Sequence, residues 1–151
     1  MLFKRIFTAV AATVLLFSLA GCGDKEESKT FKANINGVDI SLTYTYQGDK
    51  VIKQTALNKI SYATIGAKSK EDAEKVLGVL SAKYQNITGV EEKLNYQDTY
   101  AEETLTVDYS KADPKALQTL LGTLSAGDVS KGVSMKQSQT LLEAQGFKEV
   151  K

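Results

Sequence analysis

The chain of 151 residues contains no histidine and no tryptophan, one proline and one cysteine. Histidine is the usual general base near neutral pH and a leading metal ligand, so its absence removes one of the commonest tools of enzymes. The one arginine, Arg5, stands near the start, and every later basic residue is a lysine. Arginine is the usual residue for two-point capture of carboxylate or phosphate. Its scarcity is weaker evidence, because a lysine-rich genome would also encode few arginines.

The single cysteine, Cys22, follows a segment with the parts of an export signal. Lys4 and Arg5 precede an apolar stretch, residues 6–19, which is shorter than the roughly 20 residues of a membrane-spanning helix. The sequence Leu-Ala-Gly-Cys that ends at Cys22 resembles the bacterial lipobox. A bare signal peptide or a buried helix is the alternative, but neither requires a cysteine at this place. We therefore expect residues 1–21 to be a lipoprotein signal peptide, cleaved between Gly21 and Cys22.

The resemblance implies that Cys22 carries a diacylglyceryl group and becomes the first mature residue. Because one acyl chain binds a membrane only marginally, stable anchoring takes two or more chains, such as palmitate. The partner at Cys22 is then membrane lipid, on the extracytoplasmic side. Gly23 is not the aspartate that retains lipoproteins in a Gram-negative inner membrane, so we expect the outer membrane there and the outer face of the cell membrane in a Gram-positive cell. The lysine bias favours the Gram-positive case.

The rest of the chain is predicted to be one domain. Residues 22–30, the lipidated cysteine and a polar, charged segment, are expected to form a flexible tether, and residues 31–151 a domain large enough to fold without disulfides. Once the thiol is lipidated, no free sulfur is left for a disulfide, a nucleophile or a metal. The mature chain has 17 basic and 18 acidic residues, which disfavours nucleic acid as a partner. Nothing in the sequence indicates the oligomeric state.

Strand patterns fill the first part of this domain. Asn36-Gly37 between two apolar runs predicts a hairpin, because a type I′ turn needs positive φ at both positions. Strands are expected at 31–35, 38–47, 51–56, 60–65, 90–97 and 102–109. In the second of them, the tyrosines Tyr44 and Tyr46 alternate with threonines. Tyrosines in this pattern are more often core residues than a ligand platform.

Three helices are predicted from their capping residues and apolar spacing. The first begins at Ser69 with Asp72 three positions on, and its apolar stripe is Ala73, Val76, Leu77, Leu80 and Tyr84. The second begins at Asp113-Pro114 and carries Leu117, Leu120, Leu121 and Leu124. The third begins at Ser134 with Gln137 and ends at Gly146, with Phe147 packing back on Leu142. We therefore predict an α+β fold, an antiparallel meander of about five to six strands with about three helices on one face.

Candidate sites are few. Glu91-Glu92, Asp98 and Glu102-Glu103 form an acidic stretch that a hard cation could use, but it lacks the alternating ligands and central glycine of a calcium loop, so solvated charge is the better interpretation. A pair of carboxylates for hydrolysis could come from any of 18 acids. The threonines Thr43, Thr45, Thr104 and Thr106 are more simply the wet side of a sheet than an interaction surface. We predict no catalytic, cofactor-binding or metal-binding residue.

Several segments of the chain resemble the YehR-like family of small bacterial lipoproteins. They are LTYTYQGDKVIKQTA (42–56), ISYATIGAKSKEDAEKV (60–76), KYQNITGV (83–90), VDYSKAD (107–113) and LLEAQGFKEV (141–150). The resemblance implies an envelope location and transfers Cys22 as the lipidation site, and it implies no mechanism.

From these observations the sequence predicts a membrane-anchored cell-envelope lipoprotein that is not an enzyme. It is expected to bind an envelope protein or a small ligand, with a protein partner favoured. The alternative is an envelope hydrolase that uses carboxylates or a bound cation. A cleft with convergent acids of perturbed pKa would support the alternative. An exposed apolar patch would support the protein partner.

Overall fold

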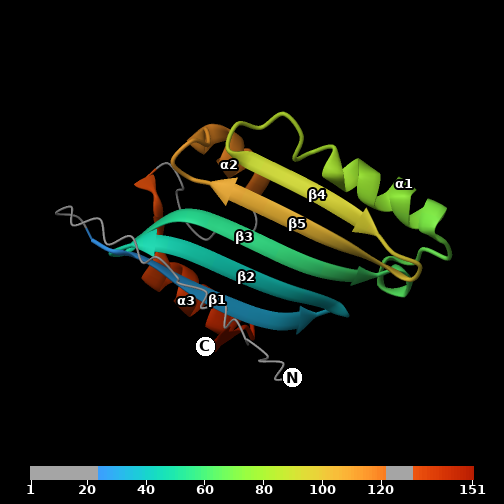
Figure 1. Cartoon of the computed structure of the whole chain (residues 1–151), viewed down its shortest axis with the longest axis horizontal. Helices are drawn as coiled ribbons and strands as arrows, with labels where there is room; N and C mark the ends of the chain where they lie inside the picture. The colour runs from blue at the N-terminus through green and yellow to red at the C-terminus, as the bar shows by residue number, and fades with distance from the viewer. Residues whose placement is uncertain (1–23, 122–130) are drawn as a thin grey trace, which may run out of the picture.

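A computed structural model describes residues 24–121 and 131–151, which share one seven-stranded antiparallel sheet (Figure 1). The strands lie in the order β4-β5-β3-β2-β1-β7, and β6 pairs with β3 outside this path. The strands are β1 (Glu26–Ile35), β2 (Val38–Gln47), β3 (Lys50–Ser61), β4 (Val90–Tyr96), β5 (Tyr100–Asp108), β6 (Val133–Ser134) and β7 (Lys148–Val150). The helices are the 3-10 helix η1 (Tyr62–Ile65), α1 (Lys70–Ser81), α2 (Pro114–Leu121) and α3 (Met135–Ala144).

The Asn36–Gly37 turn joins β1 and β2 as predicted. Asn36 has φ 51° and Gly37 has φ 82°, the two positive values that a type I′ turn requires. Ile35 therefore pairs with Val38, and the register continues without a break to Glu26 opposite Gln47. The structure thus places residues 26–30, which the sequence predicts to be part of a flexible tether, in β1. Their polar side chains lie at an exposed end of the sheet, so they show no apolar alternation to mark the strand.

The predicted break at residues 57–59 is wrong, because β3 runs unbroken from Lys50 to Ser61. The side chains alternate through the supposed gap: Ala56 and Ile60 are buried, whereas Leu57 and Lys59 are exposed. The prediction of a strand at 60–65 is also wrong beyond Ser61. The chain turns there into η1, which ends at Gly66 with a left-handed φ of 72°.

Helices α1 and α3 begin at the predicted capping residues. Ser69 accepts a hydrogen bond from the backbone N–H of Asp72, and Ser134 accepts one from Gln137, both at 3.2 Å. At the end of α3, Gly146 has φ 90° and the N–H of Phe147 reaches the carbonyl of Leu142 at 3.0 Å. This is the predicted Schellman arrangement.

Asp113 caps α2, since its Oδ1 accepts the N–H of Lys115 at 2.8 Å. Leu117 is buried. The predicted apolar positions Leu120, Leu121 and Leu124 lie outside the residues whose side chains are described.

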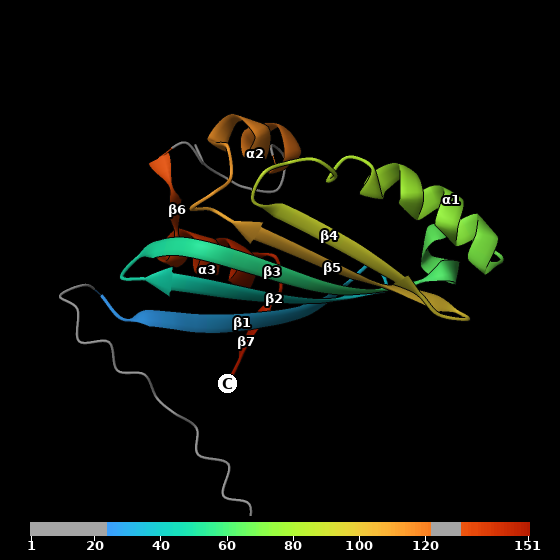
Figure 2. The same ribbon diagram turned by 45° about the horizontal axis from the view of Figure 1, so that its top comes forward.

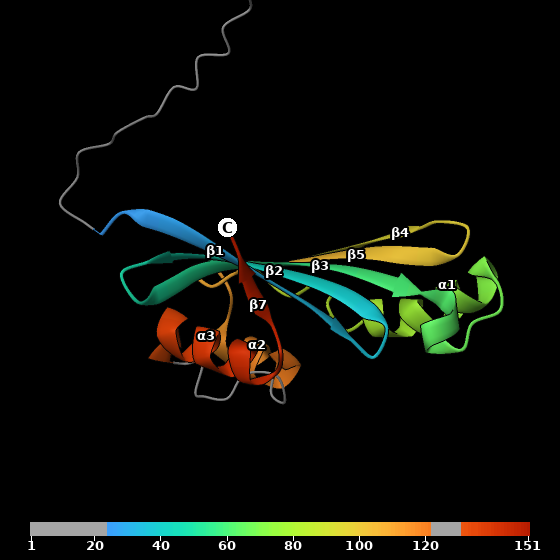
Figure 3. The same ribbon diagram turned by 90° about the horizontal axis from the view of Figure 1, so that it is seen from below.

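The helices cover one face of the sheet, and we call the opposite face the open face (Figure 3). Figure 2 shows α1 and α2 on the β4 side and α3 behind β2 and β3. The largest group of buried side chains lies between α3 and the sheet: Phe31, Tyr44, Tyr46, Val51, Met135, Leu142 and Phe147. Tyr44 and Tyr46 are therefore core residues, as predicted, and burial raises the pKa of Tyr44 to about 12.

The α+β prediction is confirmed, including helices on one face. The strands β6 and β7 were not predicted, because segments of two and three residues are too short to show alternation. They pair with stretches of β3 and β1 that have no longer strand on that side. Val51 pairs with Val133 of β6, and Thr30 pairs with Val150 of β7.

Candidate functional site

A ladder of threonines crosses the open face. Thr30, Thr43, Thr55 and Thr106 stand opposite one another on β1, β2, β3 and β5. The hydroxyl oxygens of Thr30 and Thr43 lie 2.9 Å apart, and those of Thr55 and Thr106 lie 3.4 Å apart. These hydroxyls satisfy one another across the strands, as expected for the solvated side of an antiparallel sheet. The predicted wet face, including Thr45 and Thr104, is thus the open face.

Beside this ladder, the open face contains a hollow of about 690 Å³. Two rows of side chains from β1, β2, β3 and β5 form its walls. The row next to the threonines is Lys32, Ser41, Leu57 and Thr104. The outer row is Asn34, Asp39, Lys59 and Glu102. The floor is the backbone of the residues between them, Ala33, Ile40, Asn58 and Glu103, whose side chains lie on the other face of the sheet by strand alternation. We call this site the open-face hollow.

The rows give the open-face hollow its shape. Residues two apart along a strand are about 6.6 Å apart, and neighbouring strands are about 4.8 Å apart. The hollow is therefore a trough about 7 Å between its rows and about 14 Å long, which runs across the strands. Leu57, whose exposed fraction is 52 %, is the apolar side chain of the row next to the threonines.

Charges of both signs alternate along the outer row. Asp39 accepts a hydrogen bond from Asn34 at 2.7 Å, which fixes the carboxylate at one end. Lys59 stands between Asp39 and Glu102 in the strand register. Its Nζ lies 4.2 Å from the centre of the Tyr100 ring, a cation–π contact that holds the ammonium at the edge of the trough. The site therefore offers a carboxylate, an ammonium and a second carboxylate in sequence.

A second polar group lies on the helix-covered face. Asn58 donates to Glu103 at 2.6 Å, and Glu92 accepts from Ser81 at 2.6 Å and from Gln85 at 3.1 Å. Burial raises the pKa of Glu103, and the nearby charge of Glu92 raises it further. One oxygen of Glu92 and the amide oxygen of Asn58 are buried without a hydrogen-bond partner. The contacts of Glu92 attach the end of α1 and the chain after it to β4, and the Asn58–Glu103 bond links β3 to β5.

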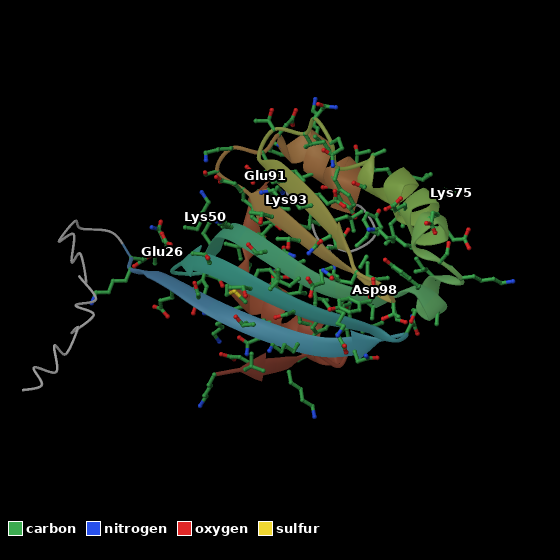
Figure 4. All side chains as sticks on the ribbon, turned by 45° about the vertical axis from the view of Figure 1, so that its right-hand side comes forward. Glu26, Lys50, Lys75, Glu91, Lys93 and Asp98 are labelled. Atoms are coloured by element: carbon green, nitrogen blue, oxygen red, sulfur yellow. The ribbon has the colours of Figure 1, made fainter. Side chains whose placement is uncertain are left out.

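The predicted acidic stretch is divided by the strands. Glu92 and Glu103 face the helices, whereas Glu91 and Glu102 are exposed. Figure 4 shows Glu91 and Asp98 at opposite ends of β4. Within residues 24–121 and 131–151, no three acidic, histidine or cysteine side chains lie close enough to hold a metal ion together.

An apolar stripe on α1 is exposed. Val76, Val79 and Leu80 have exposed fractions of 43 %, 67 % and 47 %. The predicted stripe is therefore only partly correct: Ala73 and Leu77 are buried against the sheet, Val76 and Leu80 remain accessible, and Tyr84 lies beyond the helix. Only one side of α1 packs on the sheet, and that contact is too narrow to bury all five residues of the predicted stripe.

The lipidation site Cys22 and the cleavage site after Gly21 lie outside the described residues. Among those described, none of the helices has both the length and the apolar character to cross a bilayer.

The open-face hollow was not predicted, because residues 57–59 were assigned to a connection. The sequence itself obscures the strand here, because Leu57 is apolar on the exposed side and Asn58 is polar on the opposite side.

Comparison with known proteins places the chain. Residues 27–148 match a family described as proteins of unknown function, DUF1307. The chain belongs to this family. The uncharacterised lipoprotein YehR of Escherichia coli is 59 % identical over 150 residues, which cover 99 % of this chain and 98 % of that protein. The uncharacterised lipoprotein Lin0239 of Listeria innocua is 53 % identical, over 99 % of this chain and 97 % of that protein.

Two solved structures share the fold of this family member. The NMR structure of Escherichia coli YehR has 58 % identity and a TM-score of 0.76, and the match covers 85 % of this chain and 94 % of that one. A protein from Streptococcus pneumoniae has 14 % identity and a TM-score of 0.60, with 99 % of each chain covered. The second likeness shows the fold alone. The predicted family and the lipoprotein class are thereby confirmed.

Proposed function

We propose that this chain is a non-enzymatic binding module, anchored through lipid on Cys22 to the extracytoplasmic side of an envelope membrane. The anchor is supported by the lipobox-like sequence at Cys22 and by lipoprotein relatives that match this chain almost from end to end. The ligand is an extended peptide segment of another envelope protein, bound in the open-face hollow.

The alternating charges of the outer row carry this proposal. A surface that presents Asp39, Lys59 and Glu102 in sequence is complementary to a ligand with charges of both signs. A peptide has such charges, and its backbone can also bond to the hydroxyls of Ser41 and Thr104. An apolar side chain would cover Leu57, and a trough about 14 Å long takes roughly four extended residues.

The carboxylates of Glu92 and Glu103 are the best candidates for the enzyme alternative. Glu103 has the raised pKa that a general acid needs. Both groups, however, are bonded to neighbouring side chains, and Glu92 joins the end of α1 to β4. This arrangement supports a structural role for the two glutamates. We therefore expect the double variant Glu92→Gln, Glu103→Gln to bind the peptide as the wild type does.

The first experiment locates the partner. A photo-crosslinking amino acid replaces Leu57 in the open-face hollow or Val79 on α1, two exposed positions that serve as matched sites on opposite faces. We expect crosslinks from position 57 to one defined segment of an envelope protein, and none to that segment from position 79. Crosslinks to that segment from position 79 alone would overturn the hollow as the site.

The second experiment tests the chemistry with a synthetic peptide of the crosslinked segment. Lys59→Glu should weaken its binding roughly two- to fivefold, the range of exposed ion pairs, and a peptide with the facing acid changed to lysine should restore it. Val79→Ser is the control and should not change the affinity. Thermal stabilisation by a neutral sugar, weakened by Lys59→Glu and absent with any peptide, would contradict the peptide proposal.

A further inference from the structure

The chain joins the sheet almost directly after the proposed anchor. β1 begins at Glu26, and Asp24 already lies against the turn between β2 and β3. A Cβ atom added to Gly48 of that turn would come within 2.6 Å of the Asp24 carboxylate, so the two are in close contact. The first described residue is therefore held at one end of the sheet.

The distance left for a tether is short. Gly23 alone stands between Cys22 and Asp24, and a chain spans at most about 3.6 Å per residue, so the two residues from Cys22 to Asp24 reach about 7 Å. We infer that the end of the sheet formed by the start of β1, the β2–β3 turn and the start of α3 faces the lipid headgroups. This inference rests on the proposed lipidation of Cys22.

The membrane-facing end carries charges of both signs. Lys25 and Lys50 lie there with Asp24 and Glu26. The carboxylate of Asp49 accepts hydrogen bonds from the backbone N–H of Lys136 and the hydroxyl of Ser134. Figure 4 shows Glu26 and Lys50 at this end, and Asp98 and Lys75 at the other. A mixed surface gives little net attraction to headgroups. The short covalent tether, rather than charge, therefore sets the orientation.

The orientation determines where the open-face hollow is presented. Its β1 residues, Lys32 and Asn34, lie six and eight positions beyond Glu26, which corresponds to roughly 20 and 26 Å along the strand. The strands thus point away from the bilayer and carry the hollow above the headgroups. Its ligand approaches from the envelope space, which excludes the lipids of the same membrane as ligand.

The test uses the lipidated full chain in vesicles, where the thioether at Cys22 leaves no other thiol to label. Lys50→Cys and Asp98→Cys are matched exposed positions at the two ends. Each receives a fluorophore that a nitroxide on lipid headgroups quenches at short range. We expect position 50 to be quenched several-fold more strongly than position 98. Equal quenching at both positions, or stronger quenching at position 98, would overturn the orientation.

Two further variants separate the tether from the anchor. A flexible insert of about ten residues between Gly23 and Asp24 should reduce the quenching at position 50 while the protein still floats with the vesicles. Unchanged quenching would mean that surface contacts, and not the tether, hold the domain, which contradicts the inference. Cys22→Ser should abolish flotation. Flotation of Cys22→Ser, or labelling of Cys22 itself by the fluorophore, would instead overturn the proposed anchor.

Discussion

The amide nitrogen of Asn58 lies 2.6 Å from a carboxylate oxygen of Glu103, and this bond links β3 to β5 on the face beneath the helices. Asn58 favours the charged form of Glu103, but burial and the charge of Glu92 outweigh it and raise the pKa. The folded state therefore holds the Glu103 proton more tightly than the unfolded chain, whose glutamate pKa is about 4.3. The cost to folding is absent below that pH and grows as the pH rises through the pKa of the folded state.

Glu103→Gln should remove this cost and keep an acceptor for Asn58. We expect the variant to be more stable than the wild type at pH 7, and this advantage to be smaller at pH 4. Urea unfolding at the two pH values measures the difference. Glu102→Gln, on the exposed outer row of the open-face hollow, is the control and should show no such gain. A loss of stability in Glu103→Gln that is larger at pH 7 than at pH 4 would contradict this expectation, because it would show that the charged carboxylate of Glu103 stabilises the fold.

Gly89→Ala should be strongly destabilising. The residue has φ 76°, and an added Cβ would lie 2.7 Å from the backbone nitrogen of Ala112 and 2.9 Å from the carbonyl oxygen of Asp108. We expect a loss of about 1 to 3 kcal/mol from the strained backbone alone, with further loss from the clash. Gly78→Ala is the matched control. It lies inside α1 with nothing within 4 Å, so it should gain about 0.5 to 1 kcal/mol in thermal unfolding.

Phe31→Ala should cost about 3 to 5 kcal/mol, because the ring is fully buried and its removal leaves a cavity. The ring meets Tyr44 edge to face, with centroids 6.1 Å apart, so the same change should also release the Tyr44 hydroxyl from burial and lower its pKa from about 12. Leu57→Ala, at a half-exposed position of the same sheet, should change stability by less than about 1 kcal/mol. Chemical unfolding and ultraviolet titration of tyrosine measure the two effects.

Ser69→Ala removes the cap of α1 and should cost about 1 kcal/mol. Ser134→Ala should cost more, because Ser134 not only caps α3 but also donates a hydrogen bond to Asp49 at 2.7 Å. The part of this cost that comes from Asp49 should be full near neutral pH and fade in acid, since the pKa of Asp49 is lowered by the backbone N–H of Lys136 and then by Ser134. That stabilisation is present above the usual aspartate pKa and is lost as the pH falls below it. Equal cost for the two serines would contradict the contribution from Asp49.

The sequence predicted the elements whose signals are local. The Asn36–Gly37 turn and the serine caps each act through one or two residues, so their structure follows from their chemistry. The errors arose where the structure of a segment depends on a pairing partner that is distant in the sequence. The sequence predicts Leu57 in a connection between two strands, yet its pairing with Ser41 and Thr104 keeps it inside β3. The open-face hollow consists of such pairings across four strands, so it was missed as well.

The exposed stripe on α1 shows the same limit. Val76 and Leu80 have the spacing of buried residues, but how much of an amphipathic helix is covered depends on where the sheet ends beneath it. The helix packs through Ala73 and Leu77, near Ile60 and Ala101, and no second layer of the described chain lies over its other side. Periodicity predicts the helix, and only the packing shows which of its apolar residues become surface.

β7 lies beside β1, and Lys29 and Glu149, 120 positions apart, form an ion pair between them. A ribosome adds roughly 5 to 20 residues per second, so about 6 to 24 s pass between the synthesis of Lys29 and that of Glu149. During that interval the edge of β1 is open to any other extended chain. Pairing over so great a separation is also slow, because the loop must close before the contact forms. β7 therefore covers the edge of β1, and this edge stays open until residues 148–150 have been made.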